Sequence, residues 1–216
     1  MEKNTPTPEQ VDGGEDIIAK ARANRKTITA VLIAAAVIII AVLAWLMIAQ
    51  AGSKKADELV AKADIEQNDS IASTLYAEAA KAGYKSGHRA AAMVAINLYR
   101  QGKYEETIKY LDNADLDDEI GAAGVYSLKG DCYVNLDKFD DAISCYKKAI
   151  GKADKNPEIV PFVLIKEANV YAAQQKYADE AKCYKTIIDE YPGYVRSSRV
   201  DINKYYERAA ARAQKK

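Results

Sequence analysis

The chain has 216 residues with 31 basic and 31 acidic side chains, so its formal net charge is zero. Nucleic-acid binders normally carry a basic excess that neutralises phosphates, and this balance disfavours that class. All 15 tyrosines and both phenylalanines follow residue 50, in an alanine-rich part with few β-branched runs. That composition is typical of a helical domain, and the length after residue 50 is that of one domain.

The first 26 residues form a short charged tail, which we expect to be largely disordered and cytoplasmic. Met1–Gly14 contains two Thr-Pro pairs, a Gly-Gly pair and few apolar residues. Basic residues are more frequent before the following apolar run than after it. They are Lys20, Arg22, Arg25 and Lys26 before it, and Lys54 and Lys55 after it. This asymmetry predicts a cytoplasmic tail and a C-terminal domain on the other side of the membrane.

Thr27–Ala49 is an apolar run without a charge, a proline or a glycine. A helix of this length extends roughly 34 Å, enough to cross a hydrocarbon core of about 30 Å. We predict a transmembrane helix over 27–49 that stays in the protein as an uncleaved anchor. Ala49-Gln50-Ala51 also has the small-x-small pattern of a signal-peptidase site, so cleavage after Ala51 is the alternative.

Residues 53–192 contain an internal repeat. The central copy has Tyr126, Gly130, Tyr133, Phe139, Ala142, Tyr146 and Ala149. The copy before it has Ala95, Leu98, Gly102, Tyr104, Thr107, Leu111 and Ala114, and the copy after it has Leu164, Ala168, Tyr171, Tyr177, Tyr184, Ile187 and Pro192. A weaker first copy has Ala72, Tyr76 and Ala79.

This pattern resembles the tetratricopeptide repeat (TPR), a pair of antiparallel helices that stacks on its neighbours. We therefore predict an all-α fold: one transmembrane helix, then a TPR-like α-solenoid of about four helix pairs. Small residues should let the two helices of a pair approach, Gly130 against Ala142 in the central copy. In the third copy Glu180 stands where a small residue is usual.

Residues 195–216 are predicted to form a polar-backed helix that caps the solenoid. They carry seven basic residues against Asp201 and Glu207, whereas Glu105–Glu119 has seven acids and only Lys109. We interpret both stretches as solvated faces; opposed electrostatic docking surfaces are the alternative.

Nothing in the sequence indicates an enzyme. The only histidine is His88, and nucleotide loops, nucleophile elbows and metal-ligand spacings are absent. We expect no cofactor, no metal and no small-molecule substrate. Cys132, Cys145 and Cys183 are an odd number without a CxxC pair, so we expect buried thiols; a Cys132–Cys145 disulfide stays open if the compartment is oxidising.

The layout of tail, span, degenerate repeats and a closing DINKYYERA helix is similar to bacterial single-span TPR proteins of the YfgM type, and particularly to their relatives in Bacteroidetes-like bacteria. That family is ancillary to the Sec translocon. The resemblance implies an inner-membrane protein whose periplasmic TPR domain acts as an adaptor or chaperone-like accessory. Its partners would be translocon subunits, periplasmic chaperones or unfolded clients. The resemblance implies no catalytic residue.

An envelope scaffold, which self-assembles or organises an outer-membrane or cell-wall complex, is the alternative function. A cytosol-facing import receptor would need the opposite topology. In each case the partner is expected in the concave groove of the solenoid. We predict that the groove is lined by Arg89, Ile96, Tyr99, Arg100, Ser127, Asp131, Asn135, Phe162, Ile165 and Asn169. These residues do not reproduce the Lys/Asn carboxylate clamp, so a C-terminal EEVD-type ligand is not expected.

Overall fold

The computed structural model describes residues 25–215, which form ten helices, labelled α2 to α11. No strand occurs among these residues, and the all-α prediction is confirmed. The predicted disorder of the tail, together with Lys20 and Arg22, lies outside the described residues. The chain divides into two compact units between Ala51 and Gly52, and each is described by itself.

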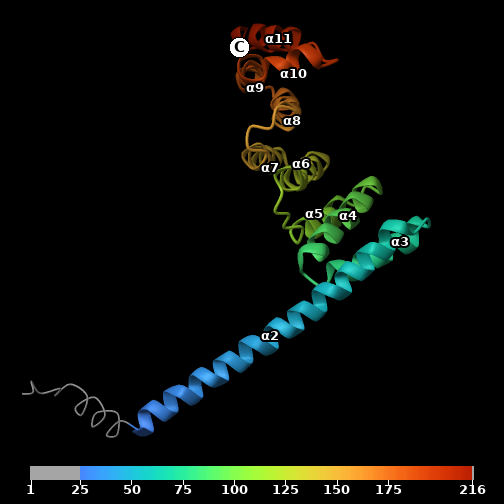
Figure 1. Cartoon of the computed structure of the whole chain (residues 1–216). Coiled ribbons are helices and arrows are strands. Elements are labelled where there is room, and N and C mark those ends of the chain that lie inside the picture. Colours follow the sequence, from blue (N-terminus) through green and yellow to red (C-terminus); the bar gives the residue numbers. More distant parts are fainter. Residues whose placement is uncertain (1–24, 216) are drawn as a thin grey trace, which may run out of the picture. The chain divides into compact units, whose positions relative to one another are not determined.

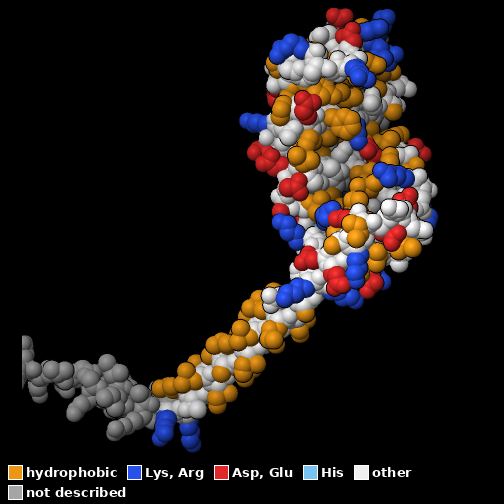
Figure 2. Space-filling model, turned by 45° about the vertical axis from the view of Figure 1, so that its right-hand side comes forward, with side chains coloured by type: hydrophobic (Ala, Val, Ile, Leu, Met, Phe, Trp, Pro, Cys, Tyr) orange, Lys and Arg blue, Asp and Glu red, His pale blue; other side chains and the backbone are white. Residues whose placement is uncertain are grey.

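The first unit contains the apolar part of α2, which runs from Arg25 to Ile65. This part is the only candidate for a membrane-crossing helix in residues 25–215, judged by length and composition. Its large side chains are exposed, as the orange side chains along this helix show in Figure 2. Trp45, for example, is 66% exposed. Exposed apolar side chains on every face of a helix are typical of a segment in contact with lipid.

The second unit begins with the C-terminal part of α2. The α-helix does not end after the apolar run, because residues 50–65 contain no proline and only one glycine. Val60 and Ala63 of this part pack with Tyr76 and Ala79 of α3 (Asp69–Ala80). The last part of α2 is therefore the first helix of the first repeat pair.

The remaining helices form further antiparallel pairs, which succeed one another in chain order in Figure 1. The second pair is α4 (Lys85–Arg100) and α5 (Tyr104–Leu111), and the third is α6 (Glu119–Asn135) and α7 (Phe139–Lys152). The fourth pair is α8 (Ile159–Ala173) and α9 (Tyr177–Glu190), followed by α10 (Pro192–Ser197) and α11 (Ile202–Gln214).

The turn inside each of these three pairs has the same backbone form. Gly102, Asp137 and Gln175 all have φ between 56° and 74°, in the left-handed region. A residue in this conformation ends one helix and reverses the chain within a few residues. Acidic residues then occupy the first turn of α5, α7 and α9, where they interact favourably with the helix dipole.

The positions that defined the repeat in the sequence form the core. Tyr76, Leu111, Tyr146 and Tyr184 are all at most 9% exposed. Four clusters of buried side chains follow one another along the solenoid, and each of these four residues belongs to a different cluster. Each pair thus buries its apolar residues partly against its own partner helix and partly against the next pair.

The atoms nearest to Gly130 belong to Tyr146 of α7. A Cβ atom on Gly130 would lie 2.7 Å from Cδ1 and 3.0 Å from Cζ of Tyr146, and closer still to Cε1. The space left by the missing side chain is therefore filled by the Tyr146 ring, one turn beyond the predicted partner Ala142. A ring this close to the helix backbone leaves no room for a side chain at position 130.

The C-terminal end is covered by α11, as expected of a capping helix. Ile202 and Ala209 are buried against α9, and the Tyr205 ring lies 5.7 Å from the Tyr184 ring, centroid to centroid. The predicted helix over 195–216 is divided in two: α10 ends at Ser197, and α11 begins at Ile202.

Candidate partner-binding face

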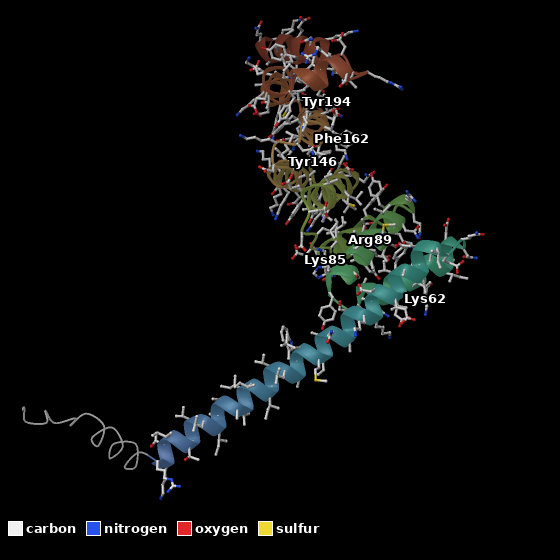
Figure 3. All side chains as sticks on the ribbon, in the orientation of Figure 1. Lys62, Lys85, Arg89, Tyr146, Phe162 and Tyr194 are labelled. Carbon is white, nitrogen blue, oxygen red and sulfur yellow. The ribbon has the colours of Figure 1, made fainter. Side chains whose placement is uncertain are left out.

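The predicted groove residues lie on the first helix of three successive pairs. Four of them come from α4, three from α6 and three from α8. Figure 3 labels Arg89 on α4 and Phe162 on α8, with Tyr146 of α7 between them along the chain. The face carried by α4, α6 and α8 is called the A-helix face below.

The centre of the A-helix face is a polar cluster around Asp131. One carboxylate oxygen accepts a hydrogen bond from the Tyr146 hydroxyl at 2.7 Å, and the other binds Lys166 Nζ at 2.6 Å. Lys166 also donates to Ser127 Oγ at 3.1 Å. Its Nζ lies 4.8 Å from the centroid of the Phe162 ring. These contacts connect α6, α7 and α8. They hold Lys166 and Asp131 as a hydrogen-bonded ion pair whose opposite charges offset each other.

Lys166 was not among the predicted groove residues, although it belongs to the centre of this face. It directly follows Ile165, which was among those residues. Its long side chain nevertheless reaches Asp131 of α6, the first helix of the preceding pair, 35 residues earlier in the chain. A basic residue four positions after Phe162 was a signal, since the two lie on one side of a helix.

Beside this cluster the A-helix face presents one exposed aromatic side chain. Phe162 is 52% exposed, although it is a large aromatic side chain in the middle of the domain. Gly124 of α6 is also exposed, and a Cβ atom there would meet nothing within 4 Å. Figure 2 shows hydrophobic side chains gathered on this unit between the charged ones. An exposed aromatic ring is a typical anchor point for a partner side chain.

Arg89 is already engaged in an ion pair within the domain. Its Nη2 binds Asp64 Oδ2 of α2 at 3.0 Å, and Tyr76 donates its hydroxyl proton to Asp64 Oδ1. The hydrogen bond from Tyr76, followed by the nearby Arg89, holds the pKa of Asp64 below its usual value. Part of the hydrogen-bonding capacity of Arg89 is therefore used to join the first two helix pairs.

The same three-part contact thus occurs twice in the domain. A tyrosine of the second helix donates to an aspartate of the first helix, and that aspartate binds a cation from the next pair. The sets are Tyr76, Asp64 and Arg89, and Tyr146, Asp131 and Lys166. Because each set bridges successive pairs, it fixes the spacing between neighbouring helices on this face.

The remaining predicted residues vary in exposure. Arg100, Asn135 and Asn169 are exposed, whereas Ile96, Tyr99 and Ile165 are half-buried and Ser127 is buried. The Tyr99 ring packs edge-on against the Tyr104 ring at 5.6 Å, and burial, followed by the charge of Asp131, raises the Tyr99 pKa. Partners would therefore meet mainly the exposed amides, the Arg100 guanidinium and the Phe162 ring.

The three cysteines and the only histidine have structural roles in the fold. Cys132, Cys145 and Cys183 are buried free thiols, and burial raises the pKa of Cys132 and of Cys183 to about 12. A thiol that stays protonated is a poor nucleophile. His88 Nδ1 lies 2.8 Å from the carbonyl oxygen of Asp115, which attaches α4 to the loop before α6. Over residues 25–215 no three histidine, cysteine, aspartate or glutamate side chains are grouped to hold a metal ion.

Helix pairs in tandem, with a partly open A-helix face, agree with the comparison to protein families. The model of the tetratricopeptide repeat-like domain matches residues 57–172, more than half of the chain. The chain belongs to this TPR-like family. Such repeats form a protein-interaction scaffold, which is typically not enzymatic.

The solved structures that resemble this chain include two structures of MamA. One crystal structure of MamA protein is 17% identical, covers 77% of this chain and 88% of its own, and has a TM-score of 0.50. A second MamA structure is 18% identical, covers 68% of this chain and 89% of its own, and has a TM-score of 0.49. At these identities the likeness concerns the fold alone. No curated protein matches the chain.

Proposed function

We propose that this protein is a membrane-anchored TPR-like interaction module, which captures protein partners on its A-helix face. The observation that carries the proposal is the Phe162 ring, which is 52% exposed and lies 4.8 Å from Lys166 Nζ of the central polar cluster. A soluble domain gains free energy by burying such a ring, roughly 1.5–3 kcal/mol for a whole side chain. A partner side chain that covers Phe162 gains part of this energy on binding.

The membrane anchor is the exposed apolar part of α2. We propose a single-pass, uncleaved helix over 27–49 in the inner membrane, with the tail in the cytoplasm and the TPR-like domain in the periplasm. Its support is the length and composition of the run and the basic residues before it, of which Arg25 and Lys26 begin α2. The continuity of α2 past Ala51 agrees with an uncleaved anchor.

The proposed partners are translocon subunits, periplasmic chaperones or unfolded secretory clients, as the YfgM-type resemblance implies. The A-helix face agrees with extended, mostly uncharged segments, because Asp131 and Lys166 already neutralise each other at its centre. An extended client segment could place an apolar side chain on Phe162 and form backbone hydrogen bonds with Asn135 and Asn169.

Site-specific photocrosslinking in cells tests the proposal. A photoreactive amino acid at Phe162 should crosslink to translocon subunits, chaperones or secretory clients. A matched control is Ile71 of α3, which is 50% exposed on another part of the domain. Crosslinks to cell-wall or outer-membrane components at Phe162 would instead favour the envelope scaffold. Identical crosslinks at both positions would refute a dedicated A-helix face.

Topology is tested separately by protease digestion of intact spheroplasts. The TPR-like domain should be digested, while a tag at Met1 stays protected. Protection of the domain would reverse the proposed orientation.

A further inference from the structure

A second surface with defined chemistry lies at the C-terminal end of the TPR-like domain, away from the residues of the A-helix face. It is a hollow of about 520 Å³ at the start of α11. Three of its six lining residues are basic. The lining consists of Arg199, Val200, Asp201, Lys204, Tyr205 and Arg208.

Arg208 is held in place by two contacts within the domain. Its Nη2 lies 3.5 Å from Oε1 of Glu180, which is fully buried in α9, and its guanidinium carbon lies 4.6 Å from the centroid of the Tyr205 ring. The second carboxylate oxygen of Glu180 has no hydrogen-bond partner in the described part of the chain. Glu180 occupies a repeat position that is usually small. A buried carboxylate is costly unless it is paired, so its presence here fixes the position of Arg208 at the hollow.

The other two cations are available to a ligand. Neither Arg199 nor Lys204 has an ion-pair partner within 4.0 Å among residues 25–215, and both are exposed. The only acid in the lining, Asp201, accepts a hydrogen bond from the backbone nitrogen of Lys204 at 3.1 Å and thereby caps α11. Residues 195–216 carry seven basic and two acidic side chains, so the surrounding field is positive as well.

We propose that this hollow is a second binding site, which takes a short acidic segment of a partner protein. Two or more carboxylates of the segment would bind Arg199, Lys204 and the outer edge of Arg208, since arginine pairs well with planar carboxylates. Val200 and Tyr205 supply an apolar wall for the intervening side chains. A single phosphate ion is much smaller than the hollow, and a flat bilayer surface does not enter a concave site. A peptide therefore agrees best with its shape.

The test uses the full-length protein in nanodiscs of phosphatidylcholine and a fluorescent acidic octapeptide. The control peptide has the same sequence with asparagine and glutamine in place of the acids. Anisotropy should show binding of the acidic peptide only, and the binding should weaken with added salt. The double variant R199A/K204A should bind about tenfold more weakly, the effect of about 1.4 kcal/mol. Both side chains are exposed, so this variant should keep its circular dichroism spectrum.

A matched double variant separates the site from general electrostatics. K103A/K109A removes two exposed lysines from the second helix pair and should bind the peptide as the wild type does. Equal weakening in both variants would overturn the site, as would equal binding of the neutral peptide. Displacement of the peptide by millimolar inorganic phosphate, or by phosphatidylglycerol added to the nanodisc, would assign the hollow to phosphate or lipid instead. Phe162→Ala should leave this binding unchanged, so failure here and failure of the A-helix face are distinguishable.

Discussion

Two glycines of the same helix should respond in opposite directions to the same substitution. Gly124 and Gly130 both lie within α6, where alanine is more favourable than glycine by about 1 kcal/mol. At Gly124 the new methyl group meets nothing within 4 Å. Gly124→Ala should therefore stabilise the domain by roughly 0.5–1 kcal/mol.

At Gly130 the same methyl group collides with three atoms of the Tyr146 ring. Tyr146 is only 2% exposed, and its hydroxyl donates to Asp131 at 2.7 Å, so the ring cannot move without losing contacts. Overpacking costs roughly 1–3 kcal/mol, and a weakened hydrogen bond to a charged group costs about 1.5–3 kcal/mol. After subtraction of the gain of about 1 kcal/mol in helix propensity, Gly130→Ala should destabilise by about 2 kcal/mol or more.

The assay is thermal unfolding of the full-length protein in a mild detergent, followed by near-ultraviolet circular dichroism of tyrosine. All 15 tyrosines follow residue 50, so the tyrosine part of this signal reports the TPR-like domain and not the apolar part of α2. For a domain of this size about 1 kcal/mol corresponds to roughly 2–4 °C. Gly124→Ala should raise the midpoint by that amount, and Gly130→Ala should lower it by about twice as much. Midpoints that shift together would refute the packing of Tyr146 on Gly130.

Three further results are expected. Burial raises the pKa of Glu167. Its contribution to the free energy of unfolding is therefore complete below the ordinary pKa of a glutamate and is lost as pH rises through the pKa of the folded state. Glu167→Gln should raise the melting temperature at neutral pH and raise it less in acid, and an equal rise at both pH values would contradict this. Arg208→Ala leaves the buried Glu180 carboxylate unpaired and should lower the free energy of unfolding, measured by denaturant melts, by about 2 kcal/mol. The loss is smaller than for a fully buried ion pair because Arg208 is partly exposed. Adding Glu180→Gln should restore most of that loss, and a double variant as unstable as the single one would show that the pair is not the cause. The three buried thiols should react with iodoacetamide only after unfolding, and rapid labelling of native protein would disprove their burial.

The sequence by itself determined the fold class, the repeat register and the apolar run, because these depend on short-range patterns. The buried residues Tyr76, Leu111, Tyr146 and Tyr184 recur at spacings of 35, 35 and 38 residues, and acids recur where second helices begin. Such signals involve residues within one helix or one turn, so they are visible without coordinates. The all-α repeat fold was predictable for this reason, and so was the cap formed by α11.

Only the tertiary structure decided which charges pair. Arg89 binds a residue 25 positions earlier and Lys166 one 35 positions earlier, so neither pairing has a local signature. The sequence therefore assigned Arg89 to the lining of the groove and omitted Lys166. The partner of Glu180 was equally invisible, because Arg208 approaches it from a helix 28 positions later in the chain. Helix packing determines these contacts, because it sets which flexible side chains come within hydrogen-bonding distance of one another across separate helices.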